Sequence, residues 1–574
     1  MTPRTATPAP RASLLARFGP LAAVLAAFAL VAVLASTGRD DGTSTASAGG
    51  SGPSGGSSEA AGGSASDLVP ITWDDAKEAG TTDTQQWDSS CDPTTGRIEF
   101  PSIYAPPCVA ARPGVKGGKT WPGVTADAIK VVLYEPADDD LAASLQAVSD
   151  PVDVQRRTRE KLVQMFAANY ETWGRKIEVV NFKGTGSDET SARADAVTVA
   201  EELGAFASIG GPPQEDAYAL ELAHRKVLCI GCGLSIPDST FQANAPYLWG
   251  TGQPPEQFFV NLGAYLTTRL NKRKAIYAGD ASMHDRDRVF GIVNFEQDPP
   301  VFTGTTKTLE KLGKANGFES KVHITYQLVL PELGEKARAI VARLKEEGVT
   351  TVVFMGDPIM PIYLTKAATD QDYFPEWIVT GTVLTDTTVF GRQYDQKQWA
   401  HAFGLGATPV NVPLEQSEAW RTYVWNYGSD PEATNVLRVA YEPIRIFMLG
   451  VHMAGPDLTP ETFRDGLFHY PVTGGSATAP QVSFGNHGFF QNPDYIGVDD
   501  SREIWWKAGV TGPDEQGKET GTGMLYSSND GARIAPGTMP DTPPDVFDEQ
   551  DSVSGYDQPI DQPPTYPSPA KPPG

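Results

Sequence analysis

The sequence has 574 residues, with 46 Lys and Arg against 71 Asp and Glu, so its formal net charge is −25. At roughly 100–200 residues per domain, this length allows about three domains, or two large lobes with additional segments. The surplus of negative charge excludes a nucleic-acid partner, because it would repel the phosphate backbone. Gly and Pro number 57 and 47, which predicts that long stretches lie outside the folded core.

Residues 1–36 contain the one long apolar run of the sequence, at 21–35. Arg4, Arg11 and Arg17 precede this run, so the positive-inside rule places the N-terminus in the cytoplasm and the remainder outside. Two interpretations stay open. The run is either a signal peptide that is removed or a membrane anchor, since the uncharged stretch 18–38 reaches the length of ~20 residues that spans a bilayer. Both predict an extracytoplasmic protein, secreted or held at the cell surface.

The four cysteines are expected to form two disulfides, because an exported chain folds in an oxidising compartment. Three pairings are possible, and the simplest joins near neighbours, Cys91 to Cys108 and Cys229 to Cys232. The second pair forms a C-x-x-C segment, which is also found in redox and zinc sites. No second pair of zinc ligands stands at a suitable spacing, and the segment ends a strand instead of opening a helix. A structural disulfide is therefore favoured, and no metal site is predicted.

The chain begins with segments that show little periodicity. Residues 37–68 are rich in Gly and Ser and predict a flexible linker. Residues 69–126 contain the first cysteine pair and predict an irregular, folded N-terminal extension. From about residue 129 short apolar strands alternate with amphipathic helices, which is typical of βαβ units and a parallel sheet. The expected strands are 129–136, 177–184, 205–211 and 227–233, and the expected helices are 156–173, 187–203 and 214–225.

After a helix predicted at 254–270, the alternation starts again and predicts a second sheet. Its strands are expected at 274–280, 322–329, 350–358 and 376–383, with helices at 305–317, at 334–347 and up to residue 368. Further helices are expected at 415–427, 433–454 and 460–468. The predicted fold is α/β, with two doubly wound parallel-sheet lobes joined by a hinge, and its domain core spans 127–510. We assign 127–253 and 480–510 to lobe 1 and 272–478 to lobe 2, with crossovers near 250–255, 395–405 and 470–482.

The C-terminal segment 511–574 lacks periodicity. It contains eleven acidic residues, three basic residues and twelve prolines, which predicts an acidic, disordered tail.

Several short motifs resemble those of type I periplasmic binding proteins, and most closely the leucine/isoleucine/valine-binding branch that serves ABC importers. They are Gly123-Val-Thr followed by Ile129-Lys-Val-Val, then Ile209-Gly-Gly, Pro246-Tyr-Leu-Trp and Val482-Ser-Phe-Gly. The resemblance covers about residues 123–510. It implies two lobes that close around a ligand held by loops at the carboxyl ends of the strands, as expected for open α/β sheets.

The resemblance implies a set of ligand-binding residues in these loops. In lobe 1 they are Glu135, Gly211, Gln214, Gly233 and Ser235, and in lobe 2 Asp280, Met283, Asp357 and Thr382. Structural roles remain open for several of them, since glycines turn a strand into a helix and aspartates cap helix N-termini. Pro212 and Pro213 remove two N–H donors, and Trp249 stands where the family often has a basic or polar residue, so both weaken the case for an α-amino acid ligand.

We therefore expect an extracytoplasmic solute-binding protein that captures a small polar ligand, an amino acid or a related compound, for an ABC importer. Its partners would be the ligand, a permease and, if the N-terminal run is retained, the membrane. No cofactor and no catalysis are expected, since G-x-S-x-G, H-E-x-x-H and phosphate-loop motifs do not occur in the sequence. A membrane-anchored ligand sensor or cell-envelope scaffold with the same fold is the alternative, and an extracytoplasmic enzyme a third possibility.

Overall fold

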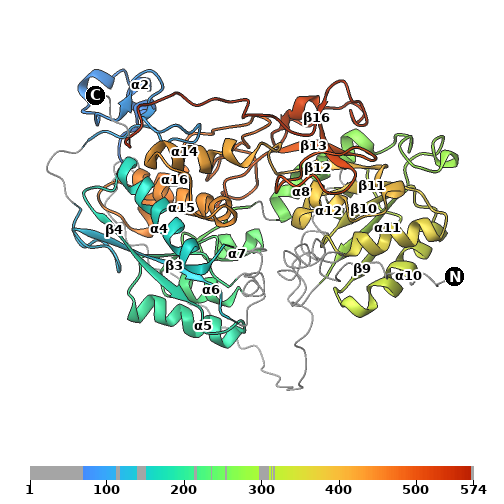
Figure 1. Cartoon of the computed structure of the whole chain (residues 1–574), viewed down its shortest axis with the longest axis horizontal. Helices are drawn as coiled ribbons and strands as arrows, with labels where there is room; N and C mark the ends of the chain where they lie inside the picture. Colours follow the sequence, from blue (N-terminus) through green and yellow to red (C-terminus); the bar gives the residue numbers. More distant parts are fainter. Residues whose placement is uncertain are drawn as a thin grey trace, which may run out of the picture.

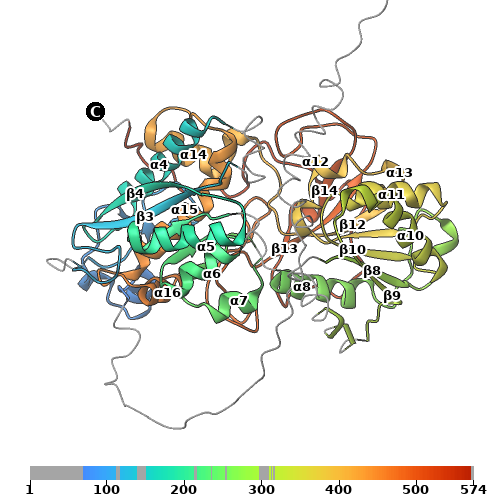
Figure 2. The same ribbon diagram turned by 90° about the horizontal axis from the view of Figure 1, so that it is seen from below.

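The computed structural model describes residues 69–111, 117–138, 150–212, 216–233, 236–252, 255–296, 309–311, 313–314 and 317–570. These residues form two α/β lobes that lie side by side, each with its own sheet (Figures 1 and 2). The N-terminal run 21–35 and the linker 37–68 lie outside the described residues. Within the described part of the chain, no helix combines the length and the apolar character that a membrane span needs.

Lobe 1 is built on a five-stranded, fully parallel sheet. Its central strand is almost entirely buried, because helices cover both faces, and this explains its continuous apolar sequence. The strand order is β4-β3-β5-β6-β7. The bounds are β3 Ala128–Glu135, β4 Lys176–Lys183, β5 Ala207–Ile209, β6 Leu228–Ile230 and β7 Leu248–Trp249.

The helices of lobe 1 come from two distant parts of the sequence. Asp188 caps the N-terminus of α5 by accepting hydrogen bonds from the N–H groups of Thr190 and Ser191. The second group lies between the parallel and the antiparallel strands of lobe 2 in the sequence, and it packs on α4 and on the lobe 1 core. The first group is α4 Val152–Asn169, α5 Glu189–Val197 with a π-helical end Thr198–Glu202, α6 Ala217–His224 and α7 Asp238–Ala243; the second is α14 Glu418–Tyr427, α15 Asn435–Ala454 and α16 Pro460–Phe468.

Lobe 2 contains a larger, mixed sheet. Strands β8 to β12 are parallel, and the later strands are antiparallel. The order is β16-β14-β13-β12-β11-β10-β8-β9, and β15 also pairs with β13. The bounds are β8 Phe290–Phe295, β9 Val322–Tyr326, β10 Thr351–Met355, β11 Glu376–Val379, β12 Ala402–Gly406, β13 Ser501–Lys507, β14 Met524–Ser528, β15 Arg533–Ile534 and β16 Ser552–Val553. The helices are α8 Pro255–Ala264 with a π-helical end Tyr265–Leu270, α10 Leu333–Glu346, α11 Met360–Asp370, α12 Thr388–Gly391 and α13 Gln396–Trp399.

The predicted assignment of segments to lobes is wrong in its second half. Helix α15 buries Leu437, Ile444 and Phe447 in the lobe 1 core, although its residues were expected in lobe 2. Strand β13 pairs with β12 of lobe 2, although residues 480–510 were expected in lobe 1. The periodicity of an amphipathic helix shows that one face is buried, but it does not show which sheet covers that face.

The strand predicted at 274–280 is also wrong. This segment is irregular, and the first strand of lobe 2 is β8, which begins at Phe290. A buried ion pair holds the segment: Arg288 donates to both carboxylate oxygens of Glu376 at 2.7 and 2.9 Å, and Glu376 also accepts from the N–H of Tyr277 at 3.1 Å. The segment 274–280 thus packs as a loop because its backbone is bound to a carboxylate at the start of β11.

The C-terminal segment is not the disordered tail that its composition predicts. Residues 524–553 contribute β14, β15 and β16 to lobe 2, and Phe547 packs against the ring of Trp505 at 5.4 Å. Residues 554–570, which we name the C-terminal strap, then cross from β16 to the N-terminal extension and α14 (Figure 1). Its aromatic side chains and hydrogen bonds to distant backbone order a segment that has no periodic pattern.

The N-terminal extension forms a small folded unit on lobe 1. We name residues 69–111 the N-terminal module; it contains α2 Trp73–Glu78, β1 Cys91–Asp92 and β2 Arg97–Ile98. The Cys91–Cys108 disulfide closes its central loop, and the second disulfide joins Cys229 to Cys232 at the end of β6. The predicted pairing of near neighbours is confirmed.

Candidate functional site

A cavity of about 680 Å³ lies between the two lobes, next to the segments that connect them. Lobe 1 lines it with the start of α14 and the first half of α15. Lobe 2 lines it with residues around α12 and with the loop that precedes β14. The connecting segments near 408–412 and 478–482 form the wall between them. A space bounded by both lobes and by their connections changes shape whenever the lobes move against each other.

The cavity lies where parallel sheets usually bind ligands, at the carboxyl ends of the strands. In lobe 1, Gly231 directly follows β6, and a Cβ atom placed there would lie 3.5 Å from Pro443 of α15. In lobe 2, α12 follows the carboxyl end of β11. The lobe 2 wall therefore comes from the edge at which the strands end, whereas the lobe 1 wall comes from α14 and α15, and α15 packs beside the corresponding edge.

Arg445 provides a buried positive charge in the lobe 1 wall. Its side chain is 1% exposed and pairs with Glu442 through hydrogen bonds of 2.8 and 2.5 Å. The guanidinium also lies 4.8 Å from the centre of the Tyr104 ring, which is a cation–π contact. Burial opposes its charge, but attraction to Glu442 outweighs this, so the pKa of Arg445 rises above its usual value. Its Nη1 atom is buried and has no hydrogen-bond partner in the described structure.

A partly buried carboxyl group, that of Glu418, lies near this arginine. The hydroxyl of Tyr441 donates to Glu418 at 2.9 Å. Burial raises the pKa of Glu418, and the positive charge of Arg445 partly offsets that effect. The arrangement offers paired charges and aromatic surface to a ligand.

The lobe 2 wall is a loop that α12 holds in place. Arg392 donates to the carbonyl oxygens of Gly512 at 2.6 Å and Gly523 at 3.0 Å, at the two ends of this loop. The Glu515 carboxylate, in turn, accepts from the N–H groups of Thr388 and Val389 at 2.7 and 3.1 Å, at the start of α12. The loop 512–523 and α12 therefore form one wall.

Arg438 joins the two walls. It stands on α15 in lobe 1 and donates to the carbonyl oxygen of Glu515 in the lobe 2 loop at 3.0 Å. A second hydrogen bond of 3.3 Å reaches the carbonyl oxygen of Val412 in a connecting segment. These bonds span the cavity and would change if the lobes opened.

The charges that line the cavity are nearly balanced, in contrast to the strongly acidic chain. Six basic and five acidic side chains line it, while the whole protein carries a net charge of −25. Apolar side chains from lobe 2 and from the connecting segments lie between them, among them Leu384, Val389, Phe390, Val410 and Val482.

Of the predicted ligand-binding residues that the structure describes, none lines this cavity. Glu135 ends β3 and pairs with Arg156 through both carboxylate oxygens, at 2.5 and 2.6 Å. Gly211 lies against Cys232, since a Cβ atom there would be 2.8 Å from the carbonyl oxygen of Cys232. Gly233 packs in the same way against Ile236. Gln214 and Ser235 lie outside the described residues.

In lobe 2, Asp357 and Thr382 lie at the carboxyl edge of the sheet but are bound within the protein. The Asp357 carboxylate accepts from the N–H groups of Ile359 and Met360 at 2.8 and 2.9 Å and from the hydroxyl of Tyr326. Burial raises the pKa of Asp357. The Thr382 hydroxyl accepts from the N–H of Gly356 at 3.0 Å. The geometry gives Asp357 the helix-capping role that the sequence left open.

Asp280 and Met283 lie at the opposite edge of the sheet. The N–H of Asp280 donates to the carbonyl oxygen of Phe374, which stands just before β11, and Met283 is buried in the lobe 2 core. Asp280 accepts from the N–H of Ser282 and caps a short 3₁₀ helix. Asp280 and Met283 were predicted to bind the ligand because a strand at 274–280 would have placed them at its carboxyl end, and that strand does not form.

Several cavity residues carry no signal in the sequence. Tyr104 stands in a segment without periodicity, and Arg445 lies in the helix predicted at 433–454, which contains none of the family motifs. Trp249, which departs from the family pattern, is 1% exposed and packs against Tyr495 at 5.0 Å, so it belongs to the core.

The last connection between the lobes contains buried carboxyl groups. Asp494 accepts from the side chain of Gln257 on α8 at 2.8 Å, and Asp499 accepts from the hydroxyl of Ser483 at 2.8 Å. Burial raises the pKa of Asp494 to about 6. Burial, together with repulsion from Asp494, raises the pKa of Asp499 to about 8. Within the described ranges, His, Cys, Asp and Glu side chains form no group of three or more that could hold a metal ion.

Comparison with known proteins identifies the type of molecule that carries this cavity. The model of the periplasmic binding protein family matches residues 162–498, more than half of the chain. No functionally curated protein sequence matches.

Solved structures with this fold are similar at low sequence identity. One is a solute-binding protein of an ABC transporter from Rhodopseudomonas palustris HaA2 in complex with p-hydroxybenzoic acid, with 13% identity, a TM-score of 0.46, and coverage of 72% of this chain and 98% of that one. A fatty acid ABC transporter substrate-binding protein from Thermomonospora curvata has 16% identity and a TM-score of 0.45, and the match covers 74% of this chain and 96% of that one. A branched-chain amino acid transporter substrate-binding protein from Streptococcus pneumoniae, in complex with isoleucine, has 15% identity and a TM-score of 0.42. That match covers 66% of this chain and 96% of the other.

Proposed function

We propose that this chain, which belongs to the periplasmic binding protein family, captures a small solute in the cavity between its lobes and delivers it to an ABC importer. The family acts outside the cytoplasm and binds small molecules. The observation that supports the assignment of the site is the cavity itself, because both lobes and their connections line it. A ligand bound there would contact both lobes and favour their closed arrangement.

The lining indicates the chemical character of the ligand. Apolar side chains cover much of the cavity, and arginines and carboxylates stand between them. A solute with an apolar body and at least one polar or charged group fits such a lining better than a uniformly polar one. The proposal therefore departs from the small, purely polar ligand that the sequence suggested.

A permease is the proposed partner, and a membrane tether through residues 18–38 is proposed if the N-terminal run is retained. The alternative of an anchored sensor or scaffold is favoured by one observation, the C-terminal strap, which links the two lobes. Genes for a permease and an ATPase beside the gene for this protein would support transport, and their absence would support the sensor.

A ligand-induced thermal shift of the full chain tests the proposal. Aromatic and aliphatic carboxylates, amino acids, amides and short peptides would be added one at a time. A ligand present at 100 times its Kd stabilises the native state by ~2.7 kcal/mol, which is visible as a higher Tm. A panel in which no solute raises Tm would contradict the proposed function.

A further inference from the structure

Segments outside the region shared with the family form one side of the cavity. Residues 162–498 match the family model, whereas Ile103 and Tyr104 come from the N-terminal module and Ser554, Pro559 and Asp561 from the C-terminal strap. We propose that the ligand site is composite: Tyr104 contacts the bound solute and helps to determine specificity, and the strap completes the wall beside it. This inference rests on the proposed function, since it names further residues of the same site.

Tyr104 is held firmly in this position. Its hydroxyl donates to the carbonyl oxygen of Pro480 at 2.6 Å, and Pro480 belongs to a segment that connects the lobes. Its own carbonyl oxygen accepts from the hydroxyl of Tyr470 at 3.1 Å. The Cys91–Cys108 disulfide closes the loop from which Tyr104 projects. A rigid aromatic side chain binds a ligand with little loss of conformational entropy, so Tyr104 suits a recognition role.

The Tyr104 ring and Arg445 together give this side of the cavity a defined chemistry. The ring covers the guanidinium at 4.8 Å, and Glu442 occupies the other side of the ion pair. An apolar aromatic face thus stands directly beside a paired charge. This pair matches a solute that has both an apolar body and a polar end.

The strap is bound to the same connecting segments. The N–H of Tyr556 donates to the carbonyl oxygen of Asn411 at 2.9 Å, and the N–H of Ile560 donates to the hydroxyl of Thr478 at 3.0 Å. At its far end, the hydroxyl of Tyr566 donates to Asp92 of the N-terminal module at 2.9 Å. The two segments that extend the family core therefore bind each other beside the cavity.

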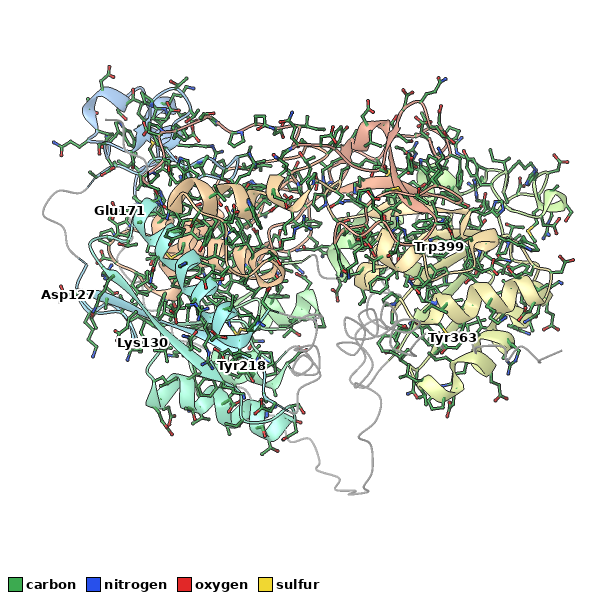
Figure 3. All side chains as sticks on the ribbon, in the orientation of Figure 1. Asp127, Lys130, Glu171, Tyr218, Tyr363 and Trp399 are labelled. Carbon is green, nitrogen blue, oxygen red and sulfur yellow. A yellow bond between two sulfur atoms is a disulfide. The ribbon has the colours of Figure 1, made fainter. Side chains whose placement is uncertain are left out.

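The test uses 8-anilinonaphthalene-1-sulfonate, an amphipathic anion whose fluorescence rises in apolar cavities, and the full chain. Tyr104→Ala should raise the Kd of the dye at least about fivefold, because both the ring and its anchor are lost. Tyr104→Phe should stay within about twofold of the unchanged protein, because the ring remains over Arg445. The matched control is Tyr363→Ala on α11 of lobe 2, a half-buried tyrosine that does not line the cavity (Figure 3).

A variant within residues 162–498, the range that matches the family model, separates this inference from the proposed function. Val389→Trp narrows the cavity from the lobe 2 side and should weaken dye binding without any change in the N-terminal module or the strap. If Val389→Trp weakens binding and Tyr104→Ala does not, the composite site is overturned while the interlobe cavity remains. If neither substitution changes the Kd, the dye does not occupy the cavity, and both proposals are overturned. Melting curves verify the fold of each variant, and Ile103→Ala replaces Tyr104→Ala if the latter does not fold, with the same expected direction.

Discussion

At the scale of single residues, the most buried charges of lobe 2 hold backbone in place. The side chains of Arg288 and Glu376 are 1% and 0% exposed, and Glu376 also accepts from the hydroxyl of Thr351 at 2.7 Å. This pair determines the path of the segment before β8, which the sequence had suggested to be a strand. A buried ion pair adds little net stability, but the loss of one partner strongly destabilises the fold, because the other charge stays buried without compensation.

Arg288→Met is expected to destabilise the protein by roughly 3–5 kcal/mol, because it leaves the Glu376 carboxylate buried without its partner. Urea unfolding followed by circular dichroism measures the change. The double variant Arg288→Met with Glu376→Gln should recover much of the loss, since the remaining side chain is neutral. Lys366→Ala, which breaks an exposed ion pair on α11, is the control and should change little. A single-variant loss below about 1 kcal/mol would contradict the role given to the pair.

At the scale of elements, the strap is the segment whose structure differs most from what its composition predicts. Its proline-rich sequence has no apolar period, yet Tyr566 and Ser568 bind the Trp425 backbone and side chain on α14 through hydrogen bonds. A prolyl segment loses little entropy when it is fixed in an extended form, so a few such anchors suffice. The strap continues from β16 of lobe 2 and is held to lobe 1 by these hydrogen bonds, so it adds a non-covalent link between the lobes that residues 162–498 do not provide.

Tyr566→Ala is expected to widen the distribution of distances between the lobes, because it releases the strap from the N-terminal module. Spin labels on Lys176→Cys in lobe 1 and Lys366→Cys in lobe 2, measured by double electron–electron resonance, report this distance. The four native cysteines are all disulfide-bonded in the structure, so the introduced thiols are the reactive ones. Asp557→Ala changes an exposed strap residue and should leave the distribution as it is. Identical distributions for Tyr566→Ala and the unsubstituted strap would show that the strap does not restrain the lobes.

At the scale of the whole molecule, the connection between the lobes links stability to pH. Asp494 and Asp499 have pKa values of about 6 and about 8, raised by burial, against a value of about 3.9 in an unfolded chain. The folded protein therefore retains protons that the unfolded chain has already released. The contribution of these two groups to the free energy of unfolding is therefore largest below about pH 4. It falls as the pH rises towards their pKa values in the folded protein, by at most about 1.4 kcal/mol per pH unit for each group.

Asp499→Asn is expected to flatten this dependence. Asparagine resembles the protonated carboxyl group, so the variant should match the original protein near pH 4, where the unfolded chain also keeps its proton, and should exceed its Tm by a growing margin up to pH 8. Differential scanning calorimetry across pH 4–8 measures both profiles, and Asp557→Asn, an exposed strap residue, is the control. Parallel profiles for Asp499→Asn and the original protein would contradict the assignment.

The sequence alone determined the fold class and the order of most elements. Residues 129–136 and 376–383 were recognised as strands because β3 and β11 are buried runs between helices, and α15 because its apolar residues repeat at helical spacing. The disulfide pairs followed from proximity in sequence and an oxidising compartment. These are local properties of a segment, and they do not depend on where the segment packs in the fold.

Only the tertiary structure decided which lobe receives α15 and β13, where Asp280 lies, and which side chains meet around the cavity. Tyr104, Arg438 and Glu515 are far apart in sequence and come together because three connections and the strap bring distant segments to one place. The same holds for the acidic C-terminal segment, whose order depends on Asn411, Thr478 and Asp92. Such contacts are long-range, so no local pattern encodes them.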